Sequence, residues 1–216
     1  VLVEKLKSGM NIACITDAGT PGISDPGEEL VRQCCEAGIK VTALPGAVAC
    51  VTALIISGLP TRRFCFEAFL PSDKKEKQEV LEELKDETRT IIIYEAPHRL
   101  VRTLKELLET LGDRRMTVLR ELTKKHETAW QTTIEDAITR YEQEDPKGEC
   151  VLVIEGRSQK EIEDEAKAAF EEISIEEHMK RYEDQGIARK EAMKLVAKDR
   201  GVTKRDIYQY LLGKES

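Results

Sequence analysis

The chain has 216 residues, of which 40% are hydrophobic and 35% are charged, so it can bury a sizeable core. The net charge of −7 argues against indiscriminate coating of nucleic acid, although it allows a local basic patch. No apolar run approaches the roughly 20 residues that span a bilayer, and the six cysteines lack C-x-x-C spacing. These features exclude secreted, fibrous, disordered and membrane proteins. We expect a cytoplasmic protein with reduced, buried thiols.

Short apolar runs alternate with helical patterns over the first 156 residues. This alternation predicts an α/β fold in which helices cover both faces of a sheet. The first residues resemble the last turns of a helix, so we also expect a further segment upstream. The expected strands are 11–16, 40–44, 64–69, 90–94, 116–119 and 150–154, and the expected helices are 28–37, 47–57, 74–86, 98–111 and 133–144.

The remaining residues show only helical patterns, at 159–170, 174–184, 187–199 and 203–212. Their charge is divided: residues 158–186 carry 4 Lys/Arg against 10 Asp/Glu, whereas residues 187–216 carry 8 against 4. The last 30 residues are therefore a basic block in an acidic protein. A helix, a glycine turn and a second helix with Thr203 as its expected N-cap are typical of a helix-turn-helix-like unit.

Residues 17–27 (DAGTPGISDPG) follow the first expected strand, where ligands bind in open α/β sheets. A turn from strand to helix usually needs about 2–6 residues, and this one is longer. Its glycines would let a ligand approach the backbone closely, and Asp25 is expected to cap the next helix, with Pro26 in its first turn. We interpret the segment as a binding loop. The alternative is an ordinary strand-to-helix turn.

A second candidate loop, residues 45–49 (PGAVA), opens a helix rich in small residues. It either leaves space for a ligand above the helix N-terminus or allows tight packing of helix on sheet. No G-x-G-x-x-G or G-x-x-x-x-G-K-[ST] motif is present. The three histidines, at 98, 126 and 178, lack metal-ligand spacing, so we expect no metal.

Six segments of the chain form a recognisable set: DAGTPGISDPG (17–27), PGAVA (45–49), SGLPTRRFCFEAFLP (57–71), YEAPHRL (94–100), RELTKKHET (120–128) and KGECVLVIEG (147–156). Taken together, they resemble the tetrapyrrole-methylase-like family of S-adenosylmethionine (SAM) dependent methyltransferases, and within it the 16S rRNA cytidine 2′-O-methyltransferases. The resemblance covers about residues 1–156, and the helical tail resembles the C-terminal extension of those enzymes.

This resemblance implies a homodimer that transfers methyl from SAM to the ribose 2′-oxygen of a cytidine in the decoding region of 16S rRNA, with rRNA or the small ribosomal subunit as substrate. It implies two α/β subdomains with mixed sheets flanked by helices: residues 1–70 as the remainder of the SAM-binding subdomain and 71–156 as the second. Residues 157–216 form the helical extension. Members begin with a G-T-P-I-G-N-L loop and an E-D-T-R segment that these residues lack, so we expect this chain to have impaired activity.

The resemblance also implies which residues contact SAM in the cleft between the subdomains. We expect Gly19→Val to abolish SAM binding while leaving the fold largely intact. The implied contacts are Asp17, Ala18, Gly19, Thr20, Pro21, Ile23, Ala47, Val48, Tyr94 and Leu122.

Transfer to a ribose hydroxyl needs a group that takes its proton, and the candidates Glu121, Lys124 and His126 follow an expected strand. Lys124 would hold a phosphate or, if buried, accept the proton. His126 is the alternative because imidazole titrates near neutrality. In the non-catalytic interpretation, Arg120 and Glu121 form a structural ion pair and Lys124 is solvated.

The basic block is the expected RNA contact, through Arg189, Lys190, Lys204 and Arg205. Alternatively, it is a packing appendage whose charges only solvate it. Two other functions stay open: a methylase of the same fold that acts on a small tetrapyrrole-type molecule, and a non-catalytic RNA-binding or assembly module.

Overall fold

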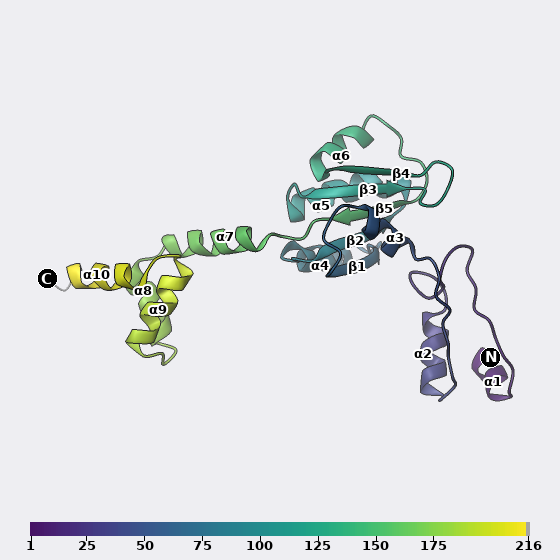
Figure 1. The fold of residues 1–216 in the computed structure, drawn as a ribbon, viewed down its shortest axis with the longest axis horizontal. Coiled ribbons are helices and arrows are strands. Elements are labelled where there is room, and N and C mark those ends of the chain that lie inside the picture. The colour runs from purple at the N-terminus through teal and green to yellow at the C-terminus, as the bar shows by residue number, and fades with distance from the viewer. Residues whose placement is uncertain (215–216) are drawn as a thin grey trace. The chain divides into compact units, whose positions relative to one another are not determined.

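Five strands form one mixed sheet in the computed structural model, which describes residues 1–214. Their order across the sheet is β1-β2-β5-β3-β4 (Figure 1). β1 is parallel to β2, whereas β5 is antiparallel to both β2 and β3. The carboxyl ends of β1, β2 and β3 therefore meet at one edge. The strands are β1 (Phe64–Phe69), β2 (Thr90–Glu95), β3 (Arg115–Arg120), β4 (Thr128–Thr133) and β5 (Cys150–Ile154).

Helices cover the two faces of this sheet unequally. Alternate side chains of a strand point to opposite faces, so Ile91 and Ile93 join one core and Ile92 joins another. The larger core lies under α4 (Lys74–Lys85), α5 (Leu100–Leu111) and α6 (Ile134–Tyr141). The smaller core lies under α3 (Ala49–Ile56). This mixed sheet with flanking helices confirms the predicted α/β architecture.

The C-terminal end of α3 is fixed to the sheet by two side chains. Thr117 Oγ1 and Gln131 Nε2 both donate to the carbonyl oxygen of Ser57, at 2.8 and 3.3 Å. Because Thr117 and Gln131 are paired neighbours on β3 and β4, they anchor the helix at one place on the sheet. The N-terminal end of α3 is thereby directed towards the edge where the strands end.

The first 48 residues depart most from the sequence-based expectations. Segments 11–16 and 40–44 are not strands, because a strand needs a hydrogen-bonded neighbour and none of residues 1–214 provides one. Among residues 1–47 only Cys34, in α2 (Glu28–Glu36), is buried. The short helix α1 (Leu2–Lys7) contacts α2.

Two smaller expectations are also wrong. The helix α2 begins at Glu28 with Gly27 as its N-cap, so Asp25 does not cap it and Pro26 lies outside its first turn. All six cysteines are free, but Cys14 and Cys35 are exposed rather than buried.

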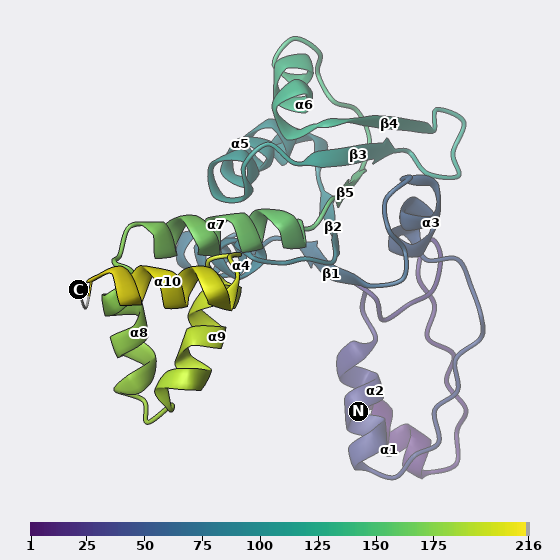
Figure 2. The same cartoon turned by 60° about the vertical axis from the view of Figure 1, so that its left-hand side comes forward.

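The helices after Arg157 form a second compact unit, separate from Val1–Gly156. α8 and α9 pack as a helical hairpin and α10 packs against both (Figure 2). This unit has its own small core of Met179, Ala192, Val196, Ala197 and Ile207. No helix among the described residues is both long and apolar enough to cross a membrane. The helices are α7 (Gln159–Glu171), α8 (Ile175–Glu183), α9 (Arg189–Asp199) and α10 (Lys204–Lys214).

Candidate functional site

The two loops singled out in the sequence lie against each other. The backbone N–H of Thr20 donates to the carbonyl oxygen of Ala47 at 2.9 Å. This hydrogen bond joins the long loop 17–27 to the loop that opens α3. Asp17, Ala18 and Ile23 lie on the exposed part of the long loop.

The close packing of the two loops leaves no room for a side chain at Gly19 or Gly46. A Cβ on Gly19, whose φ is +78°, would lie 2.8 Å from the carbonyl oxygen of Ala47, and one on Gly46 would lie 2.6 Å from Oγ1 of Thr20. Pro21, next to Thr20, is half-buried. A side chain at Gly19 would disturb the loop pair itself, so Gly19→Val cannot separate ligand binding from local structure.

Tyr94 connects the end of β2 to the start of α3. Its hydroxyl oxygen accepts a 2.8 Å hydrogen bond from the backbone N–H of Cys50, one of the helix N-terminal donors without an intrahelical partner. Its ring meets Phe66 and Phe69 edge-on, with ring centroids 4.9 and 5.7 Å away. Burial raises the pKa of Tyr94 well above its usual value, and the charge of Asp25 adds to the shift.

Three of the residues expected at the cofactor lie around one apolar cluster. Val48, Tyr94 and Leu122 are half-buried, and all three pack against the core under α3. Tyr94 also shares a row across the sheet with Val151 of β5 and Leu119 of β3. The structure thus brings residues from three separate sequence segments to one edge of the sheet.

The three catalytic candidates lie on the loop between β3 and β4. Glu121 and Thr123 have positive φ values of 51° and 62°, so this loop is strained. Lys124 Nζ lies 3.1 Å from Glu121 Oε1, and the Lys124 side chain is 56% exposed. His126 is exposed. Lys124 was expected to accept a proton only if it were buried. Because its side chain is exposed, this condition is not met.

Arg120 has a structural role different from the expected one. Its Nε donates to the carbonyl oxygen of Lys147 at 2.9 Å, whereas Glu121 forms its ion pair with Lys124. Glu121 also lies against Gly148, where a Cβ would meet the carboxylate. The loop is thus tied to the chain that enters β5.

The four cations expected to contact RNA lie together in the helical unit. Arg189, Lys190, Lys204 and Arg205 line one cavity between α9 and α10. Thr203 begins α10 as expected: its Oγ1 accepts from the N–H of Asp206 at 3.3 Å. No group of three or more His, Cys, Asp or Glu residues in the described part of the chain could hold a metal ion.

Comparisons with known proteins agree with this architecture. The model of the tetrapyrrole (corrin/porphyrin) methylases matches residues 1–138. A protein named ribosomal RNA small subunit methyltransferase I from Synechocystis sp. is 45% identical over 216 residues, which is 100% of this chain and 76% of that protein. Its namesake from Bacillus subtilis is 47% identical, over 96% of this chain and 70% of that protein. This chain belongs to the tetrapyrrole methylase family, in its ribosomal RNA small subunit methyltransferase I branch.

Solved structures support the same fold. The methyltransferase CobJ superposes with a TM-score of 0.53 at 21% identity, over 71% of this chain and 68% of that chain. As a tetrapyrrole methylase, the chain is a member of a family of SAM-dependent methyltransferases, which confirms the expected enzyme class and cofactor. The boundary expected at residue 70 stays a prediction.

The residues at the sheet edge suit SAM, as expected for a tetrapyrrole methylase. The adenine and ribose of SAM need an apolar surface with a few backbone hydrogen bonds. Val48, Tyr94 and Leu122 offer such a surface, and exposed backbone of the loops around Gly19 and Ala47 lies at the same end of α3.

Sequence reasoning missed Phe66 and Cys50, which contact Tyr94 through its ring and its hydroxyl. Phe66 was part of a motif that carried the family resemblance. Its spacing of two residues from Phe64 on β1, which puts both on one face of the sheet, is the signal that could have placed it with Tyr94. No sequence pattern marks the N–H of Cys50.

Proposed function

We propose that this chain transfers a methyl group from SAM to small-subunit ribosomal RNA, at the ribose 2′-oxygen of a cytidine in the decoding region. The names of its relatives support the substrate class, and the sequence resemblance supports the atom and the nucleotide. The basic cavity between α9 and α10 favours an RNA substrate over a small tetrapyrrole, which would make no use of it.

One observation carries the proposal. The two candidate loops, distant in sequence, are joined by the hydrogen bond from Thr20 to Ala47. They meet at the end of α3 that Tyr94 ties to the carboxyl edge of the sheet, where ligands bind in α/β folds. This proximity of Thr20, Ala47 and Tyr94 supports SAM binding at this edge of the sheet.

SAM supplies a methyl group activated on a sulfonium, so the work of the protein is alignment and exclusion of water. Positioning of this kind can lower a barrier by roughly 7–11 kcal/mol in the best cases. Val48 and Leu122 exclude water from the apolar part of the bound cofactor, and Tyr94 holds the N-terminal end of α3 in place. The exposed ammonium of Lys124 holds an RNA phosphate beside the reacting ribose. Glu121 and His126, on the same loop, are the candidate acceptors of the ribose proton.

The resemblance also supports a cytoplasmic homodimer. The described residues leave Ile15 84% and Leu44 86% exposed. In the proposed dimer, a second copy of the chain covers these two side chains.

The first test is calorimetric titration of the chain with SAM. We expect binding, and we expect Val48→Arg to abolish it by placing a charged side chain in the apolar cluster. Ile55→Arg is the matched control, because Ile55 lies on α3, the helix that begins directly after Val48, and is exposed. Failure of the wild-type chain to bind SAM, or equal loss in both variants, would contradict the assigned site.

The second test is transfer of labelled methyl from SAM to small ribosomal subunits, followed by nuclease digestion to locate the label. We expect the label on a cytidine ribose. SAM binding without transfer to subunits or to naked rRNA would favour the non-catalytic module. Transfer to a tetrapyrrole alone would favour the small-molecule methylase.

A further inference from the structure

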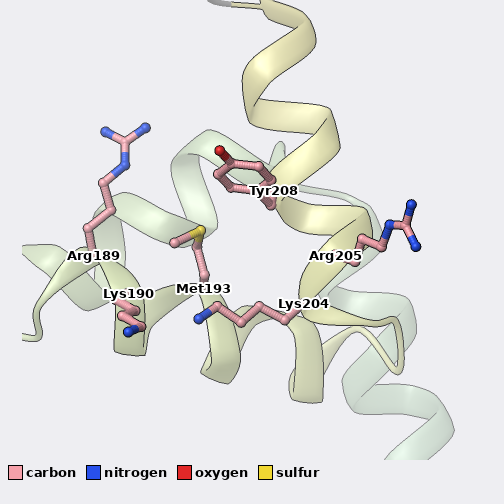
Figure 3. Close-up of a pocket in the computed structure, with 6 residues that line it drawn as sticks. All are labelled: Arg189, Lys190, Met193, Lys204, Arg205 and Tyr208. Carbon is pink, nitrogen blue, oxygen red and sulfur yellow. The ribbon is translucent and has the colours of Figure 1, made fainter.

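The cavity between α9 and α10 combines positive charge with an apolar floor. It is open to solvent over most of its extent and has a volume of about 660 Å³. Its lining residues are Arg189, Lys190 and Met193 from α9 and Lys204, Arg205 and Tyr208 from α10 (Figure 3).

The apolar part of the lining is an exposed aromatic ring beside a methionine. Tyr208 is 52% exposed, whereas its neighbour Ile207 is fully buried in the core of the unit. Met193 is half-buried at the edge of that core. Figure 3 shows Tyr208 and Met193 next to each other on the facing sides of their helices. Contact with phosphates alone would need no aromatic ring at this position.

The basic side chains surround this floor. Figure 3 shows Lys204 reaching from α10 towards α9, with Lys190 also lying below Met193 in this view, while Arg205 points away from the other lining residues. Lys190 and Lys204 therefore place two positive charges at the same side of the apolar floor.

Two carboxylates that follow lining residues in the sequence, Glu191 and Asp206, accept hydrogen bonds from residues outside the lining. Glu191 accepts a 2.8 Å hydrogen bond from Lys194, which lowers the pKa of Glu191. Asp206 accepts from the N–H and the hydroxyl of Thr203 at 2.8 and 2.6 Å. These two carboxylates are engaged in helix contacts, and the lining of the cavity itself contains no acidic residue.

We propose that this cavity binds an unpaired RNA nucleotide, with its base against Tyr208 and Met193 and its phosphate between Lys190 and Lys204. Bases stack on exposed aromatic rings in proteins that bind single strands, and lysines provide the charge for the backbone. In a duplex the base faces are covered by neighbouring bases, so the cavity selects single-stranded segments. The inference rests on the proposed RNA substrate and specifies the form of RNA that the helical unit recognises.

The test is fluorescence anisotropy of the full chain with a short labelled single-stranded RNA and with the same strand annealed to its complement. We expect tighter binding of the single strand. Tyr208→Ala should weaken that binding about tenfold, as for the loss of one stacked base, and Tyr208→Phe should keep it within about twofold. Tyr210→Ala is the matched control, because Tyr210 is an aromatic residue of α10 outside the cavity.

The salt dependence separates the roles of the ring and the lysines. Each of Lys190→Ala and Lys204→Ala should reduce the slope of log affinity against log salt by about 0.7, the value for one phosphate contact on a single strand. Tyr208→Ala should leave the slope unchanged. Lys198→Ala, which removes a charge from α9 outside the cavity, should change neither affinity nor slope appreciably.

Three results would overturn the inference. If Tyr208→Ala bound the single strand as tightly as the wild type, while the lysine variants bound it more weakly, the cavity would contact only the RNA backbone. Equal affinity for duplex and single strand would contradict recognition of an unpaired base. Unchanged affinity in all cavity variants would remove the cavity from RNA binding. None of these results depends on SAM binding or methyl transfer, so they are distinguishable from failure of the proposed function.

Discussion

Tyr94 shows how a single hydroxyl group holds the candidate site together. Its oxygen accepts the N–H of Cys50 and so replaces a side-chain cap, since α3 has no capping side chain of its own. The helix that carries Val48 at its start is thereby tied to the end of β2. The resemblance predicted Tyr94 at the site, but this hydrogen bond spans 44 positions in the chain and has no local sequence signal.

We expect Tyr94→Phe to keep the ring packing and to lose this cap. Leaving a partly buried N–H without a partner should cost about 1–2 kcal/mol of unfolding free energy, measured by chemical denaturation. SAM affinity, measured by calorimetry, should fall because the start of α3 becomes less ordered. Cys50→Ala is the control, because it alters the side chain and keeps the N–H. Unchanged stability in Tyr94→Phe would show that the hydrogen bond contributes nothing.

Lys124 gives a second prediction at the scale of a residue. Its side chain is 56% exposed and paired with Glu121, an arrangement that favours a permanently charged group holding a phosphate. We therefore expect Lys124→Arg to retain most methyl transfer to small ribosomal subunits and Lys124→Met to raise KM for them about tenfold. SAM affinity should stay the same in both variants.

The contrary result for Lys124 is equally specific. A guanidinium cannot serve as a base near neutral pH, so loss of kcat in Lys124→Arg, with unchanged KM, would make Lys124 the proton acceptor. The neighbouring Lys125→Met is the matched control, since Lys125 lies on the same exposed loop.

At the scale of elements, local patterns predicted helices and paired strands well. The strands at 64–69, 90–95 and 150–154 were expected almost to the residue, since each is an apolar run with a partner on at least one side. The runs 11–16 and 40–44 are also short and mainly apolar but are not strands, because pairing depends on a neighbour that the pattern itself does not contain.

The strand β4 (Thr128–Thr133) is the opposite case. It is rich in threonine and carries Trp130, a composition that favours strands, but it contains no apolar run and was not expected. It forms a strand because it pairs with β3, and Trp130 packs against the larger core. Position at the sheet edge, with half of its side chains exposed, explains the weak signal.

His178 lets the stability of the helical unit be tested by pH. The buried imidazole stacks between Phe170 and Tyr182, with Nε2 3.3 Å from Asp199 Oδ2 and Nδ1 accepting from Arg200 Nε at 3.3 Å. The neutral ring satisfies both partners. Burial, with the charge of Arg200 beside it, lowers the pKa of His178 below its usual 6.5.

The sign of the pH effect follows from this shift. The unfolded chain takes up a proton near pH 6.5, before the folded unit does, so the stabilisation is complete above that pH and is lost as pH falls through the lowered folded value. We expect the thermal midpoint of the helical transition, followed by circular dichroism, to fall between about pH 7.5 and about pH 5.5. His178→Gln should be less stable and should show a weaker pH dependence. An equal pH dependence in His178→Gln would assign the effect to other groups.

At the scale of the whole molecule, the end of the strand pattern in the sequence coincides with the boundary between the two compact units. Strand signals stop at Gly156, which is also the last residue of the first compact unit. The sequence could therefore predict where the helical unit begins and that its end is basic. It could not predict that Tyr208 would line a cavity with four cations, because that depends on how α9 and α10 pack.

This division predicts that SAM binding and RNA binding can be changed separately. The residues assigned to SAM lie within Val1–Gly156, whereas the basic cavity lies after Arg157, and each unit has its own core. We expect the double variant Lys190→Ala/Lys204→Ala to raise KM for small ribosomal subunits at least about tenfold, since two phosphate contacts are lost. Its calorimetric affinity for SAM should equal that of the wild type. A parallel loss of SAM affinity in this variant, absent from the Lys198→Ala control, would show instead that the helical unit helps to form the cofactor site.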